Sequence, residues 1–187
     1  MSVSRTLAAL AGGVAVAALA APAALAEERT CRGTIGAVTV DNVRVPQGAT
    51  CELAGTFVKG TVKVERAATL RASGVRVIGN VQAENAKRVV VRGGSRIGGS
   101  VQVKQGGAAS VLDSRVTGDL QYDENVRQLR AERNDVGGSI QVIKNTGGVT
   151  IAGNVVDGNL QCKENAPPPV GGGNVVQGNK EDQCRRL

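Results

Sequence analysis

Apolar and polar residues alternate along this chain in short segments that recur every 19 or 20 residues. Each repeat is built around a glycine, with an apolar residue two positions before it and further apolar residues after it. The copies read GTVKV, GNVQA, GSVQV, GDLQY, GSIQV and GNLQC, and the glycines are Gly60, Gly79, Gly99, Gly118, Gly138, Gly158 and Gly178. Alternation with a period of two predicts a strand with one buried face. A constant period of about 20 residues predicts a stack of β-coils rather than one globular core.

A second apolar segment lies earlier in each repeat. Its members are Leu70 and Ala72, Val89 and Val91, Ala109 and Val111, Leu129 and Ala131, and Val149 and Ile151. The sequence therefore predicts about three short strands per coil, with corners between them and about eight coils in all. Stacked strands lie about 4.8 Å apart, so equivalent residues should form continuous aliphatic rows. At the corner marked by the repeated glycine, we expect the chain to bend tightly between two strands.

Serine and asparagine recur at two other corners of the predicted coil. One set comes four positions before the glycine and consists of Ser95, Ser114, Asn134, Asn154 and Asn174. The other set follows the first strand and consists of Asn125, Asn145 and Asn165. Asparagine tolerates left-handed backbone geometry, and stacked amides can bond to one another along the axis. We therefore expect an asparagine ladder at these corners.

In these features the chain resembles right-handed parallel β-helix proteins, and the resemblance covers Gly33 to about Gln183. It implies an all-β solenoid with coils of about 20 residues. The plain pattern of glycine and valine is also similar to the bactofilins, whose β-helical rods polymerise end to end; this likeness implies end-to-end self-association. The bias toward Ala, Gly, Val and Arg resembles small exported proteins of high-GC Gram-positive bacteria, for which the resemblance implies no defined function.

The first 26 residues differ from the repeats and have the features of an export signal. Arg5 supplies a positive start, residues 7–19 form an apolar run, and Ala24-Leu25-Ala26 is a small-x-small cleavage motif. A membrane anchor is the alternative, because the apolar run is nearly long enough to span a bilayer. We predict a signal peptide at residues 1–26 and a mature chain without a membrane span.

Residues 27–187 have the length of one domain, and we predict a single parallel β-helix over this range. Its C-terminal part departs from the repeat. Pro167-Pro168-Pro169 stand where strand residues are expected, Gly171-Gly172-Gly173 follow, and the last motif is the charged Lys180-Glu181-Asp182. Because prolines and charges blunt the edges of natural sheets, residues 166–187 are predicted to form an irregular cap.

The chain contains four cysteines, and an even number in an exported protein indicates disulfides. Cys31 and Cys51 are 20 residues apart, and Cys162 and Cys184 are 22 apart. Each gap is about one coil, so each pair should lie on neighbouring coils, and we predict two bridges that staple the ends. A zinc site is the alternative, but the chain has no histidine and no Cys-x-x-Cys motif.

The net charge of +7 is spread along the chain rather than gathered in one segment. Such charge is explained by a solvated surface, or by weak attraction to anionic cell-wall polymers or lipid head groups that salt would screen. Aromatic residues make up only 1% of the chain, so the stacking platforms of single-strand nucleic-acid binders are nearly absent. We expect no nucleic-acid partner.

Glutamine occupies the position three residues after most of the repeated glycines. The row is Gln82, Gln102, Gln121, Gln141 and Gln161, preceded by Lys63. The flanking apolar residues point inward, so this row should lie on a flat, solvent-facing sheet. It is explained either by an amide ladder that strengthens the stack or by a repetitive surface that hydrogen-bonds a glycan. Sugar-binding faces usually contain aromatic rings, which this chain nearly lacks.

Catalysis is the weaker hypothesis. Without histidine, ordinary catalytic triads and most metal sites are excluded. A pair of carboxylates could still cleave a glycan, but the aspartates occupy different positions in their repeats; they are Asp113, Asp119, Asp123, Asp135 and Asp157. We therefore expect no enzyme, no cofactor and no metal.

These observations predict a secreted, non-enzymatic structural or interaction protein of the cell envelope or the extracellular space. It would present flat, repetitive surfaces, and its coil ends would be available for association. The alternative is a protein that binds cell-wall polysaccharide through the glutamine row and is associated with the wall. A β-helix enzyme that cleaves polysaccharide is the third and weakest possibility.

Overall fold

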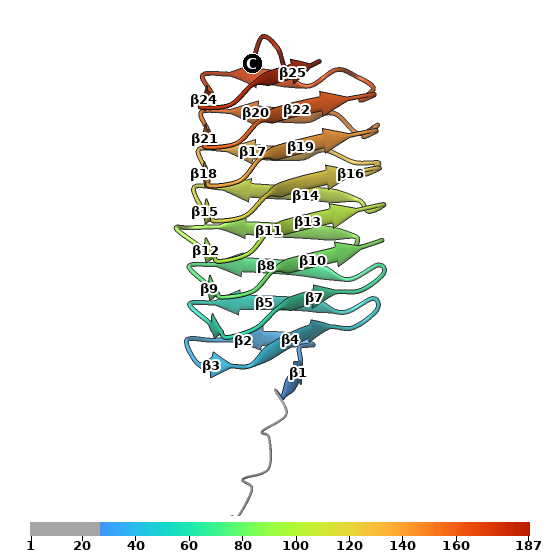
Figure 1. The fold of residues 1–187 in the computed structure, drawn as a ribbon. Coiled ribbons are helices and arrows are strands. Elements are labelled where there is room, and N and C mark those ends of the chain that lie inside the picture. The colour runs from blue at the N-terminus through green and yellow to red at the C-terminus, as the bar shows by residue number, and fades with distance from the viewer. Residues whose placement is uncertain (1–26) are drawn as a thin grey trace, which may run out of the picture.

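The computed structural model describes residues 27–187, which form an all-β parallel solenoid of three sheets (Figure 1). Each coil contributes one strand to each sheet, and the eight strands of two of the sheets correspond to eight coils. No helix occurs in this range, and none of its segments is a helix that could cross a membrane. The predicted signal peptide lies outside the described residues. The predicted fold class is confirmed.

Sheet A, at the front of Figure 1, contains nine parallel strands. Its strands are β1 (Glu28–Thr30), β4 (Asn42–Val45), β7 (Val62–Val64), β10 (Val81–Glu84), β13 (Val101–Lys104), β16 (Leu120–Asp123), β19 (Ile140–Ile143), β22 (Leu160–Lys163) and β25 (Lys180–Asp182). Strand β1 precedes the recognisable repeats, yet it pairs in parallel with β4. Sheet A therefore extends one strand further than the sequence pattern indicates.

Sheets B and C contain eight parallel strands each. Sheet B consists of β2 (Gly33–Ile35), β5 (Thr50–Ala54), β8 (Thr69–Ser73), β11 (Arg88–Arg92), β14 (Ala108–Leu112), β17 (Leu129–Glu132), β20 (Val149–Ala152) and β23 (Val170–Gly172). Sheet C consists of the two-residue strands β3 (Thr39–Val40), β6 (Phe57–Val58), β9 (Arg76–Val77), β12 (Arg96–Ile97), β15 (Arg115–Val116), β18 (Asp135–Val136), β21 (Val155–Val156) and β24 (Val175–Val176). Equivalent residues of successive repeats pair in register in all three sheets.

The core is a set of aliphatic rows along the axis of the solenoid, as predicted. In sheet A, for example, Val81, Val101 and Leu120 lie in one row and are at most 1% exposed. Residues two positions before the repeated glycines point inward from sheet C, and only Val176, near the C-terminal end, is partly buried. Burial of each such side chain contributes about 1.5–3 kcal/mol before entropic costs. No coil has a core of its own, because every row is shared with its neighbours.

The repeated glycines are required by the close approach of neighbouring coils. Their φ angles do not fall in the left-handed region, so a tight bend is not the reason for glycine. A Cβ on Gly79 would lie 2.7 Å from the carbonyl oxygen of Gly60, and one on Gly99 would meet the side-chain oxygen of Asn80. The amide of each glycine bonds to the coil below, as from Gly79 to the Gly60 carbonyl at 2.9 Å. Any side chain here would push adjacent coils apart.

Both sets of corner asparagines form buried ladders. Asn125 and Asn145 belong to one ladder, and Asn134 and Asn154 belong to the other; all four are at most 2% exposed. Left-handed backbone is found at the residue before the asparagine, for example at Glu124 (φ 55°). Tolerance of that conformation therefore does not explain the asparagines. Their side chains are selected because they satisfy buried backbone groups of two neighbouring coils.

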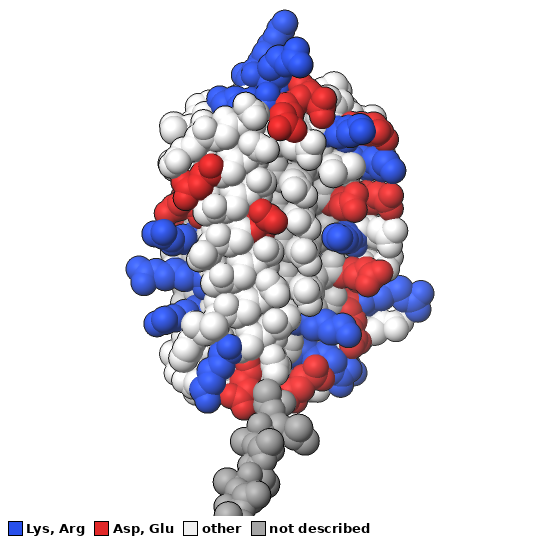
Figure 2. All heavy atoms as spheres, in the orientation of Figure 1, with Lys and Arg blue, Asp and Glu red and all other residues white. Residues whose placement is uncertain are grey.

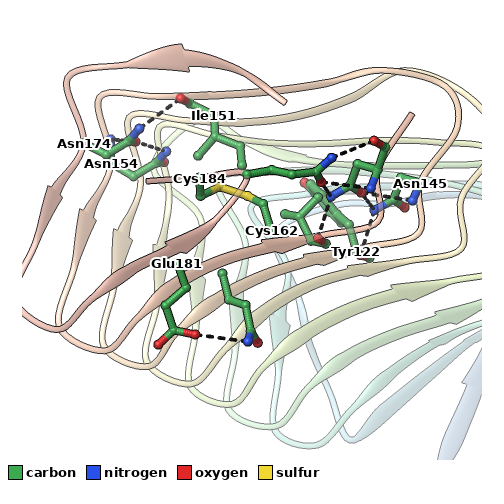
Figure 3. Close-up of a disulfide and its surroundings, with 12 residues drawn as sticks. Tyr122, Asn145, Ile151, Asn154, Cys162, Asn174, Glu181 and Cys184 are labelled. Atoms are coloured by element: carbon green, nitrogen blue, oxygen red, sulfur yellow. Dashed lines mark hydrogen bonds between the residues drawn. A yellow bond between two sulfur atoms is a disulfide. The ribbon is translucent and has the colours of Figure 1, made fainter. Parts of the chain in front are cut away.

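Both ends of the solenoid are stapled as predicted. Disulfides join Cys31 to Cys51 and Cys162 to Cys184, with Cα–Cα distances of 5.5 and 5.1 Å, and no cysteine remains free. The pairing rules out the zinc alternative for these four residues. Figure 3 shows the second bridge beside the C-terminal ends of both asparagine ladders. Disulfides occur mainly in oxidising, extracellular settings.

The segment predicted as an irregular cap, residues 166–187, contains strands β23, β24 and β25, which continue all three sheets. Only residues 183–187 leave the repeat and turn over the end of the stack. There the Cys184 amide donates to the Glu181 carbonyl, and the Leu187 amide donates to the Cys184 carbonyl, both at 3.0 Å. Leu187 packs against the core and covers part of its open end.

Candidate ligand-binding surface

The five glutamines singled out in the sequence lie in one straight row on the outer face of sheet A. The partners Gln82 and Gln102 are in register, and the same register continues through the remaining three. Each glutamine is flanked in its strand by two buried residues, so its side chain points away from the core. Gln82 is exposed and the other four are half-buried. The structure therefore brings all five residues together as a continuous row of amides.

Charged residues continue this row at both ends. Lys63 pairs with Gln82, and Arg44 pairs with Lys63 in the strand before. At the other end, Glu181 lies opposite Gln161. The row is thus cationic near the N-terminal end, neutral in the middle and anionic near the C-terminal end. A ligand lying along it would meet an ordered sequence of charges and amides.

The glutamines form only a partial ladder among themselves. Gln102 Nε2 donates to Gln121 Oε1 at 3.1 Å, and Gln161 Nε2 donates to Glu181 Oε2 at 3.1 Å. Gln141 makes no side-chain hydrogen bond within residues 27–187. A glutamine amide offers two N–H donors and an acceptor oxygen, so most of this capacity faces solvent. Strengthening of the stack therefore accounts for only part of the row.

A groove of about 600 Å³ lies beside the N-terminal half of the row, where the strands of sheet A turn toward sheet B. Gln82 and Gln102 line it, together with Lys63 and Lys104. Outward polar residues alternate with the inward-pointing Val64 and Ala83 along its wall, because strand residues alternate between the outside and the core. This groove adds a recess to an otherwise flat face.

Ion pairs order one wall of the groove. The Glu65 carboxylate accepts the backbone N–H of Gln47 at 3.0 Å and contacts Arg44 Nη1 at 3.4 Å. The hydrogen bond from Gln47 is the main reason that the pKa of Glu65 lies below its usual value, and Arg44 adds to the effect. Arg44 also pairs with Glu28 at 2.8 Å. These groups neutralise one another, whereas Lys63 and Lys104 have no ion-pair partner in the described part of the chain.

A second polar row, which sequence reasoning missed, borders sheet A on the side of sheet C. It comprises the residue after each repeated glycine, and each side-chain oxygen accepts the backbone N–H of the equivalent residue one coil further on; its members are Thr61, Asn80, Ser100, Asp119, Ser139 and Asn159. The signal was present in the sequence, because this position always holds a small polar residue. Its oxygens are used by the stack, so the row is structural rather than a ligand site.

The aspartates considered for catalysis are dispersed over several edges of the solenoid. Asp113 is bonded to Arg133 at the corner between sheets B and C, and Asp119 accepts the Ser139 amide. Asp135 pairs with Arg115 at 3.3 Å, and Asp157 accepts Gln177 Nε2 at 2.9 Å. No cluster of three potential metal ligands occurs in residues 27–187. The Asp123 side chain makes no hydrogen bond or ion pair within residues 27–187. Asp113 and Asp135 line the same hollow, but each is paired with a different arginine, so the five acids do not form one catalytic pair.

Figure 2 shows the face of sheet A as a band with few charges along the length of the solenoid. Lysine and arginine gather along the margin formed by β9, β12 and β15, and mixed charges cover the opposite margin. The neutral amide band is therefore bounded by charge on both sides. Comparison with protein-family models, with curated proteins and with solved structures finds no match to this chain.

Proposed function

We propose that this chain is an exported, non-enzymatic interaction protein of the cell envelope that binds extended polysaccharide chains along the outer face of sheet A. The observation that carries the proposal is the in-register row of outward glutamines with unused donors and acceptors. An extended glycan presents hydroxyl groups at regular intervals, and a row of amides at strand spacing presents matching partners.

Export is supported by the two disulfides at the ends of the solenoid, since such bonds persist in oxidising compartments. A binding role rather than a catalytic one is supported by the dispersed aspartates, of which Asp113, Asp119 and Asp135 each have a different local partner. The row also lacks the aromatic rings on which sugars usually stack. We therefore expect weak contacts per sugar residue, which add up over many residues of a long chain.

The proposal is tested by co-sedimentation of residues 27–187, in the oxidised form, with purified cell walls over a salt series. The informative variant is Gln121→Ala/Gln141→Ala, which removes two amides from the middle of the row. Gln47→Ala/Gln128→Ala is the matched control, because both side chains are exposed and lie outside the row. Melting temperatures of all three proteins are measured first, so that loss of binding is separated from loss of folding.

The proposal predicts that the wild type and the control pellet with walls at high salt, whereas the row variant stays in solution. Equal pelleting of the row variant and the wild type would overturn the assignment to sheet A. Sedimentation without walls would indicate end-to-end assembly, the behaviour implied by the likeness to bactofilins, and would contradict a function that depends on glycan.

A further inference from the structure

Three arginines form a ladder on the outer face of sheet C. Arg76, Arg96 and Arg115 are the first residues of β9, β12 and β15, and they are partners in register. The residue after each one is buried in the core, so the arginine side chains point to solvent, and all three are exposed. Adjacent strands lie about 4.8 Å apart, which brings like charges close together. Figure 2 shows basic side chains gathered along this margin.

A different side chain contacts the arginine at each end of the ladder. The Arg76 guanidinium lies over the Phe57 ring, 5.2 Å from its centre. Arg115 Nη1 is 3.3 Å from Asp135 Oδ2, and both side chains remain largely exposed. Arg96, in the middle, has no ion-pair partner among residues 27–187. Three cations therefore face one carboxylate.

Such a row carries a cost for the fold. Like charges directly opposite each other on neighbouring strands destabilise a sheet. At the equivalent positions of β21 and β24 the structure has the uncharged Val155 and Val175. The fold therefore does not require arginine here. An anionic ligand would offset the repulsion among the arginines by attracting each guanidinium.

A hollow of about 640 Å³ lies beside the ladder, at the corner between sheets B and C. Arg96 and Arg115 line one side of it, and its floor consists of small residues, among them Ser95 and Ser114. On the other side Arg133 is held by Asp113 through two hydrogen bonds of 2.6 and 2.9 Å. Asp113 and Asp135 also line the hollow, where Asp113 neutralises Arg133 and Asp135 contacts Arg115; among the arginines of the hollow, Arg96 is therefore the one left free for a ligand.

We propose that the arginine ladder binds a linear glycan that carries one carboxylate on each sugar residue. A guanidinium pairs with a planar carboxylate through two parallel hydrogen bonds. Adjacent arginines lie about 4.8 Å apart along the ladder, so carboxylates repeated along an extended chain can meet more than one arginine. The small residues of the neighbouring hollow leave room for the rings. This site lies on a different sheet from the glutamine row and does not depend on the function proposed for that row.

The test measures binding of oligomannuronate to residues 27–187 by calorimetry, with a neutral oligomannan of equal length and inorganic polyphosphate as comparison probes. The ladder variant is Arg76→Gln/Arg96→Gln/Arg115→Gln. The matched control is Arg71→Gln/Arg88→Gln/Arg127→Gln, which removes the same charge from exposed arginines that form no ion pair in the described range. Circular dichroism and melting temperatures establish that both variants are folded.

The ladder variant should lose about tenfold or more in affinity for oligomannuronate, since each lost charge-assisted pair weakens binding, whereas the control should change by only about twofold. Neutral oligomannan should not compete, and Gln121→Ala/Gln141→Ala should bind oligomannuronate normally. Equal weakening in both arginine variants would overturn the proposal, because it would mean diffuse charge attraction. Tighter binding of polyphosphate than of oligomannuronate would overturn the assigned ligand.

Discussion

The side-chain oxygen of Asn154 accepts two hydrogen bonds from Asn134, one from its backbone N–H and one from its Nδ2, both at 3.0 Å. Asn154 in turn donates through Nδ2 to the Ala131 carbonyl at 2.8 Å and to Asn174 Oδ1 at 2.9 Å. One fully buried amide thus connects three successive coils. Within the described chain, no buried side-chain polar atom is left without a partner.

This relationship predicts that Asn154→Leu destabilises the solenoid strongly. The change preserves volume approximately but leaves the Asn134 amide and the Ala131 carbonyl without their partners inside the core. Each buried group left unpaired costs about 1–3 kcal/mol, so we expect a loss of about 3 kcal/mol or more in the free energy of unfolding. Urea denaturation measures it. Asn179→Ala is the control, because that exposed side chain makes no hydrogen bond in the described residues; equal effects of the two changes would contradict the ladder's role.

Gly99→Ala should also destabilise the stack, although the new side chain is a single methyl group. It would collide with Asn80 Oδ1 and with the Gly79 carbonyl of the coil below, and overpacking of this kind costs about 1–3 kcal/mol. Gly36→Ala is a matched control, since a Cβ there meets nothing within 4 Å and the backbone is not left-handed. Thermal melts compare the two. A Gly99→Ala protein as stable as Gly36→Ala would show that coil spacing is not the reason for glycine.

Glu132 predicts a dependence of stability on pH. Its carboxylate accepts Arg130 Nε at 2.6 Å and Nη2 at 2.8 Å, and these bonds place its pKa below the usual value. A lowered pKa in the folded state stabilises the protein above about pH 4.3, and the contribution is lost as the pH falls through the folded-state value. Glu132→Gln should therefore cost about 1 kcal/mol at neutral pH, a modest figure because Arg130 is 43% exposed.

Urea denaturation at neutral pH and near pH 3 checks this prediction. The difference between wild type and Glu132→Gln should shrink at the acidic pH. Glu52→Gln serves for comparison, because Glu52 is exposed and has no ion pair in the part of the chain that the structure describes. An effect of Glu132→Gln that is equal at both pH values would mean that packing, rather than charge, determines its role.

Loss of the N-terminal disulfide should loosen the first coils. The Cys31–Cys51 bridge closes a loop of 20 residues, for which the chain-entropy model gives about 3 kcal/mol. Cys31→Ala/Cys51→Ala should therefore speed amide hydrogen exchange in β2 and β5, while exchange in β16 and β19 should change little, because terminal coils have only one neighbour. Uniform acceleration over all coils would contradict this local effect and would indicate that the stack opens as one unit.

The sequence was sufficient for the repeat, the inward rows and the disulfide pairs, because each of these depends on spacing alone. Val81, Val101 and Leu120 are apolar at constant intervals, and a constant interval determines both the strand face and the stacking register. The buried asparagines were predicted for the same reason. Their bonds to the backbone were not, since the bond from the Asn134 backbone N–H to Asn154 Oδ1 depends on how far one coil is displaced from the next.

Other features required the three-dimensional structure. The alternation of Arg76, Arg96 and Arg115 with buried residues covers only two positions per strand, too few to reveal an outward row. The strands β23 and β25 lie in a segment rich in glycine, proline and charge, yet neighbouring coils supply a template for pairing that overrides local propensity. The sequence predicts a tight bend at each repeated glycine, because the close contacts with the neighbouring coil cannot be recognised from the order of residues alone.

The most direct test of the central claim, that sheet A binds polysaccharide, is an NMR titration of ¹⁵N-labelled residues 27–187 with soluble, uncharged fragments of cell-wall glycan. Binding to the glutamine row predicts that the side-chain amide signals of Gln121 and Gln141 shift in proportion to occupancy, while those of Gln47 and Gln128 stay in place. Shifts confined to sheets B and C, or none at saturating concentrations of glycan, would contradict the account.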